Sequence, residues 1–192
     1  MISKYKIINK KNLYEGFYKM DEITLKYKKF NGDWSRIVKR ELFGGAQVSA
    51  VLPYDPIKKE IILIKQFRPG TISKNIDNYL LEIVAGMIDN NENPETTAKR
   101  ECLEETGCEV KKIIPIQGYF PAPGSSESFY HLFLAEVEAL TETKIMGLET
   151  ENEDILVKSY KIDDVRKKME NGEIINGLTL IALQWFFLNK TE

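Results

Sequence analysis

The segment 86–108 constrains this chain more than any other, because its spacing dictates a loop followed by a short helix. Asn93 and Pro94 are a favourable N-cap and first helical residue. Gly107 is a typical helix stop. No glycine or proline lies between Pro94 and Gly107, so the spacing predicts a helix over residues 94–106.

Acidic side chains gather on one side of this expected helix. At about 100° per residue, Glu101, Glu104 and Glu105 fall within a roughly 100° arc. Like charges three or four residues apart destabilise an isolated helix by about 0.2–0.5 kcal/mol per pair, and Arg100 offsets one of them, since it stands four residues before Glu104. Binding of Mg²⁺ or Mn²⁺, which take oxygen ligands, would relieve the rest. For the acids alone, a solvated helix face remains the ordinary alternative.

The complete pattern resembles the Nudix box, Gly-x5-Glu-x7-Arg-Glu-U-x-Glu-Glu-x-Gly-U, where U is an apolar residue. Its fixed residues are here Gly86, Glu92, Arg100, Glu101, Glu104, Glu105 and Gly107. No fixed position departs from the pattern, and Cys102 and Cys108 serve as small apolar residues at the U positions. The resemblance implies metal-dependent hydrolysis of a nucleoside diphosphate linked to another moiety.

Composition excludes several other classes of protein. Lysine and arginine number 27 against 29 acids, a net charge of −2, which argues against nucleic acid as a partner. The two cysteines form no CxxC or Cys/His cluster, so neither zinc nor a disulfide is expected, which favours a cytoplasmic protein. The N-terminal residues lack a signal-peptide core, and the apolar stretch 178–188 is too short to cross a membrane.

Hydrophobic patterning predicts a mixed α/β fold. Alternating residues predict strands over 3–9 and 14–29, and the turn signal Asn31-Gly32 pairs 17–29 with 35–43. Gly44-Gly45 separates an N-terminal β subdomain (1–45) from a hydrolase domain (46–192). Further strands are expected at 46–53, 60–67, 79–84, 110–119, 128–139 and 154–161, and helices at 94–106, 163–171 and 177–189; residues 70–78 and 140–153 are expected to be loops. The pattern indicates a mixed sheet between helices, which agrees with the α/β/α sandwich implied by the resemblance.

Segments outside the box resemble the bacterial ADP-ribose pyrophosphatase branch of this family. Pro123 lies sixteen residues after Gly107 in a Pro/Gly/Ser-rich loop, and the segments 147–155 and 176–187 are also similar. The resemblance implies hydrolysis of ADP-ribose to AMP and ribose 5-phosphate. Two alternatives remain open: hydrolysis of another nucleotide sugar such as GDP-mannose, and a non-catalytic ADP-ribose-binding sensor. The intact box acids argue against the sensor.

The resemblance also implies catalytic roles for individual residues. Two or three Mg²⁺ ions, or Mn²⁺, are expected on Glu101, Glu105 and Glu104, with the backbone carbonyl of Ala85. Glu151, in the acidic loop after residue 140, is expected to be the general base. Its near neighbour Glu153 is expected to bind a metal ion or the water, and the sequence separates the roles of these two residues only weakly. Structural roles are expected for the remaining box residues Gly86, Glu92, Arg100 and Gly107.

Substrate contacts are expected from three places in the chain. Arg68 ends the strand 60–67 and is placed to meet a phosphate or ribose. Glu82, on the strand that enters the box, is expected to bind either substrate or metal. The loop after the box offers Pro123, Gly124 and Ser125. The resemblance assigns the adenine to Phe17 and Arg40, partly from a second subunit. Because residues 1–45 are too few to fold alone, the resemblance further implies a homodimer formed by exchange of this subdomain.

Overall fold

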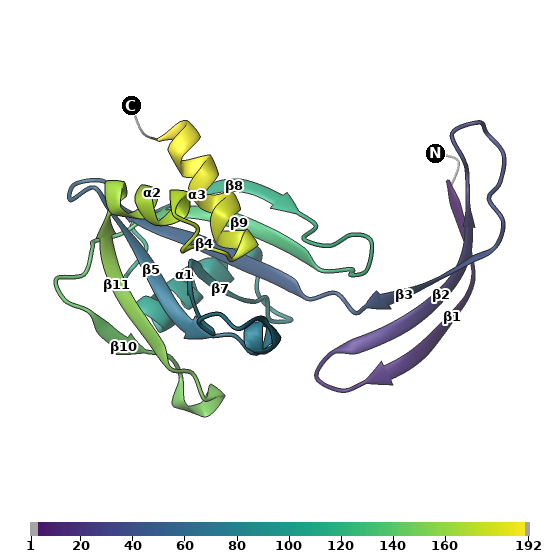
Figure 1. Cartoon of the computed structure of the whole chain (residues 1–192), viewed down its shortest axis with the longest axis horizontal. Coiled ribbons are helices and arrows are strands. Elements are labelled where there is room, and N and C mark those ends of the chain that lie inside the picture. The colour runs from purple at the N-terminus through teal and green to yellow at the C-terminus, as the bar shows by residue number, and fades with distance from the viewer. Residues whose placement is uncertain (1–3, 191–192) are drawn as a thin grey trace. The chain divides into compact units, whose positions relative to one another are not determined.

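The computed structural model describes residues 4–190, and the chain divides into two compact units (Figure 1). The first unit is Met1–Gln47 with Phe120–Phe129, and the second is Val48–Tyr119 with Tyr130–Glu192. The predicted boundary at residue 45 does not assign the segment Phe120–Phe129 to the N-terminal unit, where the structure places it. Within the first unit, that segment is tied to the N-terminal strands because the Phe43 N–H donates to the Ser125 carbonyl at 2.8 Å. Each unit is described by itself.

The first unit is an antiparallel sheet of three strands in the order β1-β2-β3. These strands are β1 (Tyr5–Glu15), β2 (Lys19–Tyr27) and β3 (Val38–Phe43). The predicted pairing across Asn31-Gly32 is confirmed, with Leu25 opposite Val38. The predicted position of the break between the two N-terminal strands, at residues 10–13, is wrong. Lys10 and Lys11 pair with β2 despite their polar sequence, and the break lies at residues 16–18. Backbone pairing with a neighbouring strand outweighs the weak strand propensity of such residues.

The second unit is built on a larger sheet with the strand order β10-β11-β5-β4-β9-β8. Its strands are β4 (Gln47–Asp55), β5 (Glu60–Phe67), β8 (Lys112–Tyr119), β9 (Phe129–Glu136), β10 (Lys144–Met146) and β11 (Ile155–Lys161). The short strand β10 lies in the segment 140–153, which the sequence indicated to be loop. It pairs antiparallel with β11, Ile145 lying opposite Leu156.

The sheet divides between β4 and β5. These two strands pair only at Tyr54–Ile61 and Asp55–Glu60. Beyond that point β6 (Tyr79–Glu82) pairs with β5, and β7 (Val84–Met87) pairs with β4. The single strand predicted over 79–84 is therefore two short strands, broken at Ile83. The Ile83 N–H donates to Thr179 Oγ1 at 3.0 Å.

Helices cover both faces of the second unit's sheet, with α1 (Pro94–Thr106) on one face and α2 (Ile162–Glu170) and α3 (Gly177–Asn189) on the other (Figure 1). Strand β5 shows the layering most clearly. Ile61 and Leu63 lie in the core beneath α2 and α3, whereas Ile62 and Ile64 lie in the core beneath α1. All four are fully buried, as a strand covered on both faces requires. The predicted mixed α/β sandwich is confirmed.

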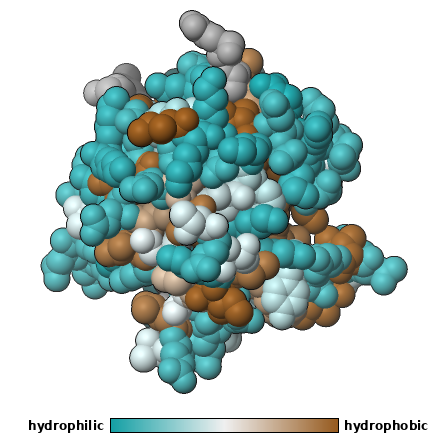
Figure 2. Space-filling view, turned by 90° about the vertical axis from the view of Figure 1, so that its left-hand side faces the viewer, coloured by the Kyte–Doolittle hydropathy of each residue, from teal (hydrophilic) through white to brown (hydrophobic). Residues whose placement is uncertain are grey.

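The apolar residues of the second unit are thus divided between two cores rather than gathered on its surface. Figure 2 shows a mostly hydrophilic face on which hydrophobic residues form small groups. The apolar stretch 178–188 belongs to α3, whose Ala182, Leu183 and Phe186 are buried. Within residues 4–190, no helix is long and apolar enough to cross a membrane.

Candidate functional site

Helix α1 has the predicted bounds and the predicted caps. Asn93 Oδ1 accepts a hydrogen bond from the Thr96 N–H at 2.9 Å. At the other end Gly107 adopts the left-handed conformation, with φ at 71°, and its N–H donates to the Leu103 carbonyl at 2.8 Å. Cys102 packs in the buried core beneath the helix as a small apolar residue. These contacts hold the helix, and the acids that it carries, in a defined orientation.

Arg100 lies at the centre of an ion-pair network. Its Nε and Nη2 donate to the two carboxylate oxygens of Glu92 at 3.0 and 2.9 Å. Its Nη1 donates to Glu101 Oε1 at 2.8 Å and to Glu104 Oε2 at 2.9 Å. The hydrogen bonds from Arg100, together with one from the Thr97 hydroxyl, lower the pKa of Glu92 to about 2. One guanidinium therefore contacts three box carboxylates.

Gly86 is required by the close approach of Glu101. Any Cβ at position 86 would collide with the Glu101 carboxylate. Gly86 lies in β7, where it is paired with Ser49 of β4, so the backbone has little freedom to withdraw. Glycine here lets a carboxylate rest directly on the strand.

Glu105 is the acid that the arginine network leaves uncompensated. Its side chain is only 3% exposed, and its Oε2 has no hydrogen-bond partner among the described residues. Burial raises the pKa of Glu105 to about 9, and the charges of Glu101 and Glu153 act in the same direction. A hydrogen bond from the Ala85 amide and the charge of Arg68 oppose the increase only in part. A buried carboxylate in this state is costly to ionise without a cation.

The acidic loop before β11 places Glu153 beside these acids. The Leu148 N–H donates to Glu153 Oε2 at 3.1 Å. Burial raises the pKa of Glu101 against the effect of Arg100, and the Glu153 charge contributes to the increase. The backbone of Glu151 lies in a short 3₁₀ helix (η2, Glu149–Glu151), but its side chain lies outside what the structure describes.

Arg68 and Glu82 form a second charged pair. Arg68 Nε and Nη2 both donate to Glu82 Oε2, at 2.9 and 2.7 Å, and Glu82 is 2% exposed. Burial alone would lower the pKa of Arg68, but the hydrogen bonds and charge of Glu82, together with the charges of Glu105 and Glu153, outweigh it and raise the pKa. The free oxygen of Glu82 accepts a hydrogen bond from Asn176 Nδ2 at 2.8 Å.

Asn176 is the residue that the sequence interpretation missed. A signal for it existed, because an asparagine before an apolar run is typical of a helix N-cap, and Asn176 caps α3. Nothing in that signal indicates that the same side chain also reaches Glu82, ninety-four positions away in the sequence.

The other expected substrate residues belong to the first unit. Phe17 is exposed in the turn between β1 and β2, with its ring centroid 4.8 Å from that of Tyr18. Arg40 is exposed on β3 and donates to the Lys39 carbonyl. The loop residues Pro123, Gly124 and Ser125 are also exposed. Their expected roles in substrate binding stay predictions.

The acids of the second unit fit a divalent cation, although they do not already form a cage. Over residues 4–190, no group of three His, Cys, Asp or Glu side chains is arranged to hold a metal ion. One oxygen each of Glu101 and Glu104 accepts a hydrogen bond from Arg100. Glu105 keeps a buried oxygen without a partner among the described residues. Carboxylate oxygens are the ligands that Mg²⁺ prefers.

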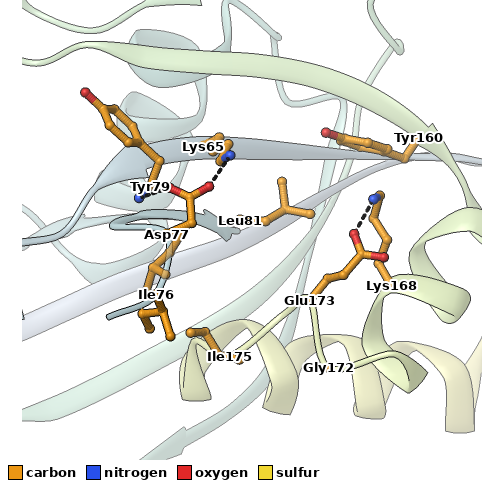
Figure 3. Close-up of a pocket in the computed structure, with 11 residues that line it drawn as sticks. Lys65, Ile76, Asp77, Tyr79, Leu81, Tyr160, Lys168, Gly172, Glu173 and Ile175 are labelled. Atoms are coloured by element: carbon orange, nitrogen blue, oxygen red, sulfur yellow. Dashed lines mark hydrogen bonds and ion pairs between the residues drawn. The ribbon is translucent and has the colours of Figure 1, made fainter. Parts of the chain in front are cut away.

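A separate pocket of about 430 Å³ lies elsewhere in the second unit (Figure 3). Two ion pairs flank it, Lys65 with Asp77 at 2.7 Å and Lys168 with Glu173 at 2.6 Å. Leu81 lies between the two pairs (Figure 3). None of the predicted site residues lines this pocket, and each lysine is already paired with an acid, so the acid cluster remains the better candidate site.

Comparison with known proteins agrees with this geometry. The family model described as NUDIX domain matches residues 45–177. The ADP-ribose pyrophosphatase of Escherichia coli (strain K12) is 37% identical over 183 residues, covering 95% of this chain and 88% of that protein. The ADP-ribose pyrophosphatase of Haemophilus influenzae is 38% identical over 189 residues, covering 97% and 87%.

Two further similarities bear on specificity and fold. The GDP-mannose pyrophosphatase of Salmonella typhimurium is 31% identical over 180 residues, covering 93% of each chain. A crystal structure of an ADP compounds hydrolase superposes with a TM-score of 0.69 and covers 96% of this chain and 93% of that one. Its sequence identity is 19%, so this likeness concerns the fold alone.

Proposed function

The chain belongs to the NUDIX domain family, and from that premise we propose that it hydrolyses the pyrophosphate of ADP-ribose to AMP and ribose 5-phosphate. The observation that carries the proposal is the acid cluster of α1 and the loop before it. There Arg100 compensates Glu92, Glu101 and Glu104 but leaves the buried Glu105 oxygen without a partner among the described residues. Such a cluster suits cation-assisted chemistry on a phosphate.

Divalent cations are assigned to this cluster. Glu101, Glu104 and Glu105, with the backbone carbonyl of Ala85, would hold two or three Mg²⁺ ions, or Mn²⁺. Bound there, the ions would neutralise the charge of the pyrophosphate and of the leaving phosphate oxygen. Gly86 lets the Glu101 carboxylate reach the strand, and Arg100 sets the direction of the glutamates.

The loop before β11 is assigned the proton transfer. The water oxygen forms a bond to one phosphorus while the bridging P–O bond breaks, and the leaving phosphate takes the electron pair. Glu151 would accept the proton of the water, and Glu153, whose charge acts on Glu101 and Glu105, would orient that water or a cation. Arg68 would contact a phosphate or the terminal ribose, with Glu82 holding its guanidinium.

The first unit is assigned to adenine and to dimerisation. Phe17 and Arg40 would hold the base, and Pro123, Gly124 and Ser125 would line the phosphate or ribose. Every residue of β1 is exposed, including apolar ones such as Ile7 and Tyr14, and exchange of this unit between two copies would cover them. Light scattering coupled to size-exclusion chromatography should give twice the chain mass at micromolar protein. A monomer would contradict both the dimer and a shared adenine site.

A second nucleotide sugar is the alternative substrate, because the GDP-mannose pyrophosphatase of Salmonella typhimurium is also similar along nearly the whole chain. The deciding experiment measures phosphate release, coupled through a phosphatase, from ADP-ribose, GDP-mannose, NADH and diadenosine polyphosphates with Mg²⁺. We expect ADP-ribose to be hydrolysed fastest. Faster hydrolysis of GDP-mannose would replace the first choice, and binding of ADP-ribose without hydrolysis would indicate a sensor.

We place the protein in the cytoplasm, without nucleic-acid or membrane partners. Both cysteines, Cys102 and Cys108, are free and buried, as suits a reducing compartment. The near balance of 27 basic and 29 acidic residues offers little attraction to a polyanion.

A further inference from the structure

The side chain of Asn176 makes two kinds of contact at the start of α3. Its Oδ1 accepts from the Thr179 N–H at 2.9 Å and from the Thr179 hydroxyl at 3.0 Å, which caps the helix. Its Nδ2 donates to Glu82 Oε1 at 2.8 Å. The first contact needs only an acceptor at position 176, whereas the second needs an amide donor.

Glu82 is held from two sides by these contacts. Arg68 takes one carboxylate oxygen and Asn176 takes the other. At 2% exposure Glu82 has almost no access to water, so both oxygens depend on protein donors. Loss of the Asn176 donor would free the carboxylate to rotate, and the guanidinium bonded to it would follow.

Arg68 differs from Glu82 in that part of it reaches solvent. Its side chain is 39% exposed. Two of its donors face Glu82, which leaves the rest of the guanidinium fork for another group. A half-exposed arginine anchored along one edge is suited to bind a phosphate with the other.

The separation of β4 and β5 explains how Asn176 reaches Glu82. Asn176 caps a helix on one face of the sheet, whereas Glu82 and its partner Arg68 are directed to the other face. Glu82 lies opposite Ile64, whose side chain enters the core beneath α1. Side chains directly opposite each other on paired strands share a face. Helix α3 packs on the other core, but β4 and β5 have separated here, and the strand break at Ile83 is bonded to Thr179.

We propose that Asn176 is a positioning residue for catalysis: its amide fixes Glu82, which orients Arg68 to receive the substrate. The inference rests on the proposed function, because it is the pyrophosphate substrate that Arg68 is held to meet. A structural cap alone would need no amide, since serine and aspartate cap helices about as well as asparagine.

Two variants separate the cap from the positioning contact. Asn176→Asp keeps an acceptor for the start of α3, removes the donor to Glu82 and sets a second carboxylate against it. Asn176→Ser also keeps an acceptor and replaces the amide donor with a shorter hydroxyl. Asn189→Asp is the matched control, because Asn189 is exposed at the far end of the same helix and bonds only the Trp185 carbonyl among the contacts described. Thermal unfolding reports whether each variant is folded.

The activity measurement is a double-mutant cycle on ADP-ribose hydrolysis. We expect Asn176→Asp to lower kcat/KM by about 10–100-fold, the usual cost of disturbing a group that orients a binding side chain, and Asn176→Ser to lower it less. In an Arg68→Lys background the same change should cost only about 2-fold, because the geometry that it disturbs is already lost. The control should stay within about 2-fold. Full additivity in the cycle, or an unchanged kcat/KM in Asn176→Asp, would overturn the proposal.

A measurement independent of activity separates this inference from the proposed function. The Nε–H signal of Arg68 in a ¹H–¹⁵N spectrum, assigned by its absence in Arg68→Lys, should exchange slowly in the wild type and fast in Asn176→Asp and Asn176→Ser. An unchanged signal in both variants would overturn the positioning role. Wild-type protein that hydrolyses none of the nucleotide sugars would contradict the proposed function, while this signal would still test the positioning.

Discussion

The two sides of helix α1 carry the same kind of residue in opposite states. On the outer side, Arg100 is bonded at hydrogen-bonding distance to Glu104 and to Glu92, which lies in the loop just before the helix. On the inner side, Glu105 is buried, lacks an ion-pair partner within hydrogen-bonding distance among the described residues, and keeps one carboxylate oxygen without a hydrogen bond. Glu101 lies between them, bonded to Arg100 and resting on Gly86.

This difference distinguishes a structural ion-pair network from a site that needs a ligand. A protein that required only a stable helix would pair or remove the inner carboxylate, since an uncompensated buried charge is destabilising. The outer side should therefore govern stability, and the inner side should govern activity. Variants of each side test that division.

The largest effect is expected at the loop that faces the inner side. Glu151→Gln should lower kcat by about 10²–10⁴, the usual contribution of a general base, with binding of Mg²⁺ nearly unchanged. Steady-state hydrolysis of ADP-ribose and Mg²⁺ titration measure the two quantities. Glu153→Gln is the matched comparison: if it abolishes turnover while Glu151→Gln leaves kcat unchanged, the two roles are exchanged.

The inner side itself should show loss of activity without loss of stability. Glu105→Gln should lower kcat by about 10²–10³, because a metal site contributes several kcal/mol to the transition state. Its melting temperature in EDTA should equal or exceed that of the wild type. Burial raises the pKa of Glu105 to about 9, so folding at neutral pH must protonate this carboxyl group, a cost that the carboxamide avoids. A variant that is both inactive and several degrees less stable would show that Glu105 serves the fold.

On the outer side we expect a loss of stability with only a modest loss of activity. Arg100→Lys keeps one charge but loses the fork that contacts three carboxylates, so we expect the free energy of unfolding to fall by about 1–3 kcal/mol. Activity should fall only about 10-fold, through less well oriented glutamates. Urea unfolding and hydrolysis rates check the two values, and a 10³-fold loss of kcat at wild-type stability would place Arg100 among the substrate-binding groups.

The smallest effect is a change in acid stability at Glu92. Its pKa is lowered in the folded protein to about 2, chiefly by hydrogen bonds from Arg100. A lowered carboxyl pKa stabilises the fold above the ordinary value of about 4.5 and loses that contribution as the pH falls toward 2. Urea unfolding at pH 6 and pH 3 should therefore show the wild type and Glu92→Gln converging at the lower pH.

The control for Glu92 lies three residues further along the chain, in the first turn of α1. Glu95 forms an exposed pair with Lys99 at 2.6 Å, and Glu95→Gln should change the free energy of unfolding by less than about 0.5 kcal/mol at either pH. If Glu92→Gln behaves like this control, the hydrogen bonds between Arg100 and Glu92 contribute little to the free energy of unfolding. The outer network would then stabilise the fold less than its geometry indicates.

Local chemistry explains which parts of the fold were predictable. The bounds of α1 follow from Asn93, Pro94 and Gly107, whose capping preferences act within a few residues, and the hairpin follows from Asn31-Gly32 in the same way. Strand β10 and the break at Ile83 depend on partners distant in the sequence, namely β11 and Thr179. Residue preferences carry no information about such partners.

The same distinction between nearby and distant partners applies to the candidate site. The spacing of Glu101, Glu104 and Glu105 is enough to predict that they share one side of a helix, because helix geometry is periodic. That spacing does not indicate that Arg100 bonds three of the box acids, or that Glu82 is held by the N-cap of α3. The Glu82 contact arises where β6 and β7 fill the opening between β4 and β5, which is a property of the assembled sheet.

The response of the melting temperature to Mg²⁺ tests the central claim most directly. Metal-free wild type and Glu105→Gln would be unfolded thermally with and without Mg²⁺, with Mg²⁺-free buffer of the same ionic strength as the reference. A ligand at about one hundred times its Kd adds about 2.7 kcal/mol to stability, so the wild type should melt several degrees higher with Mg²⁺, and Glu105→Gln should not. Equal increases in the two proteins, or none in the wild type, would contradict the account.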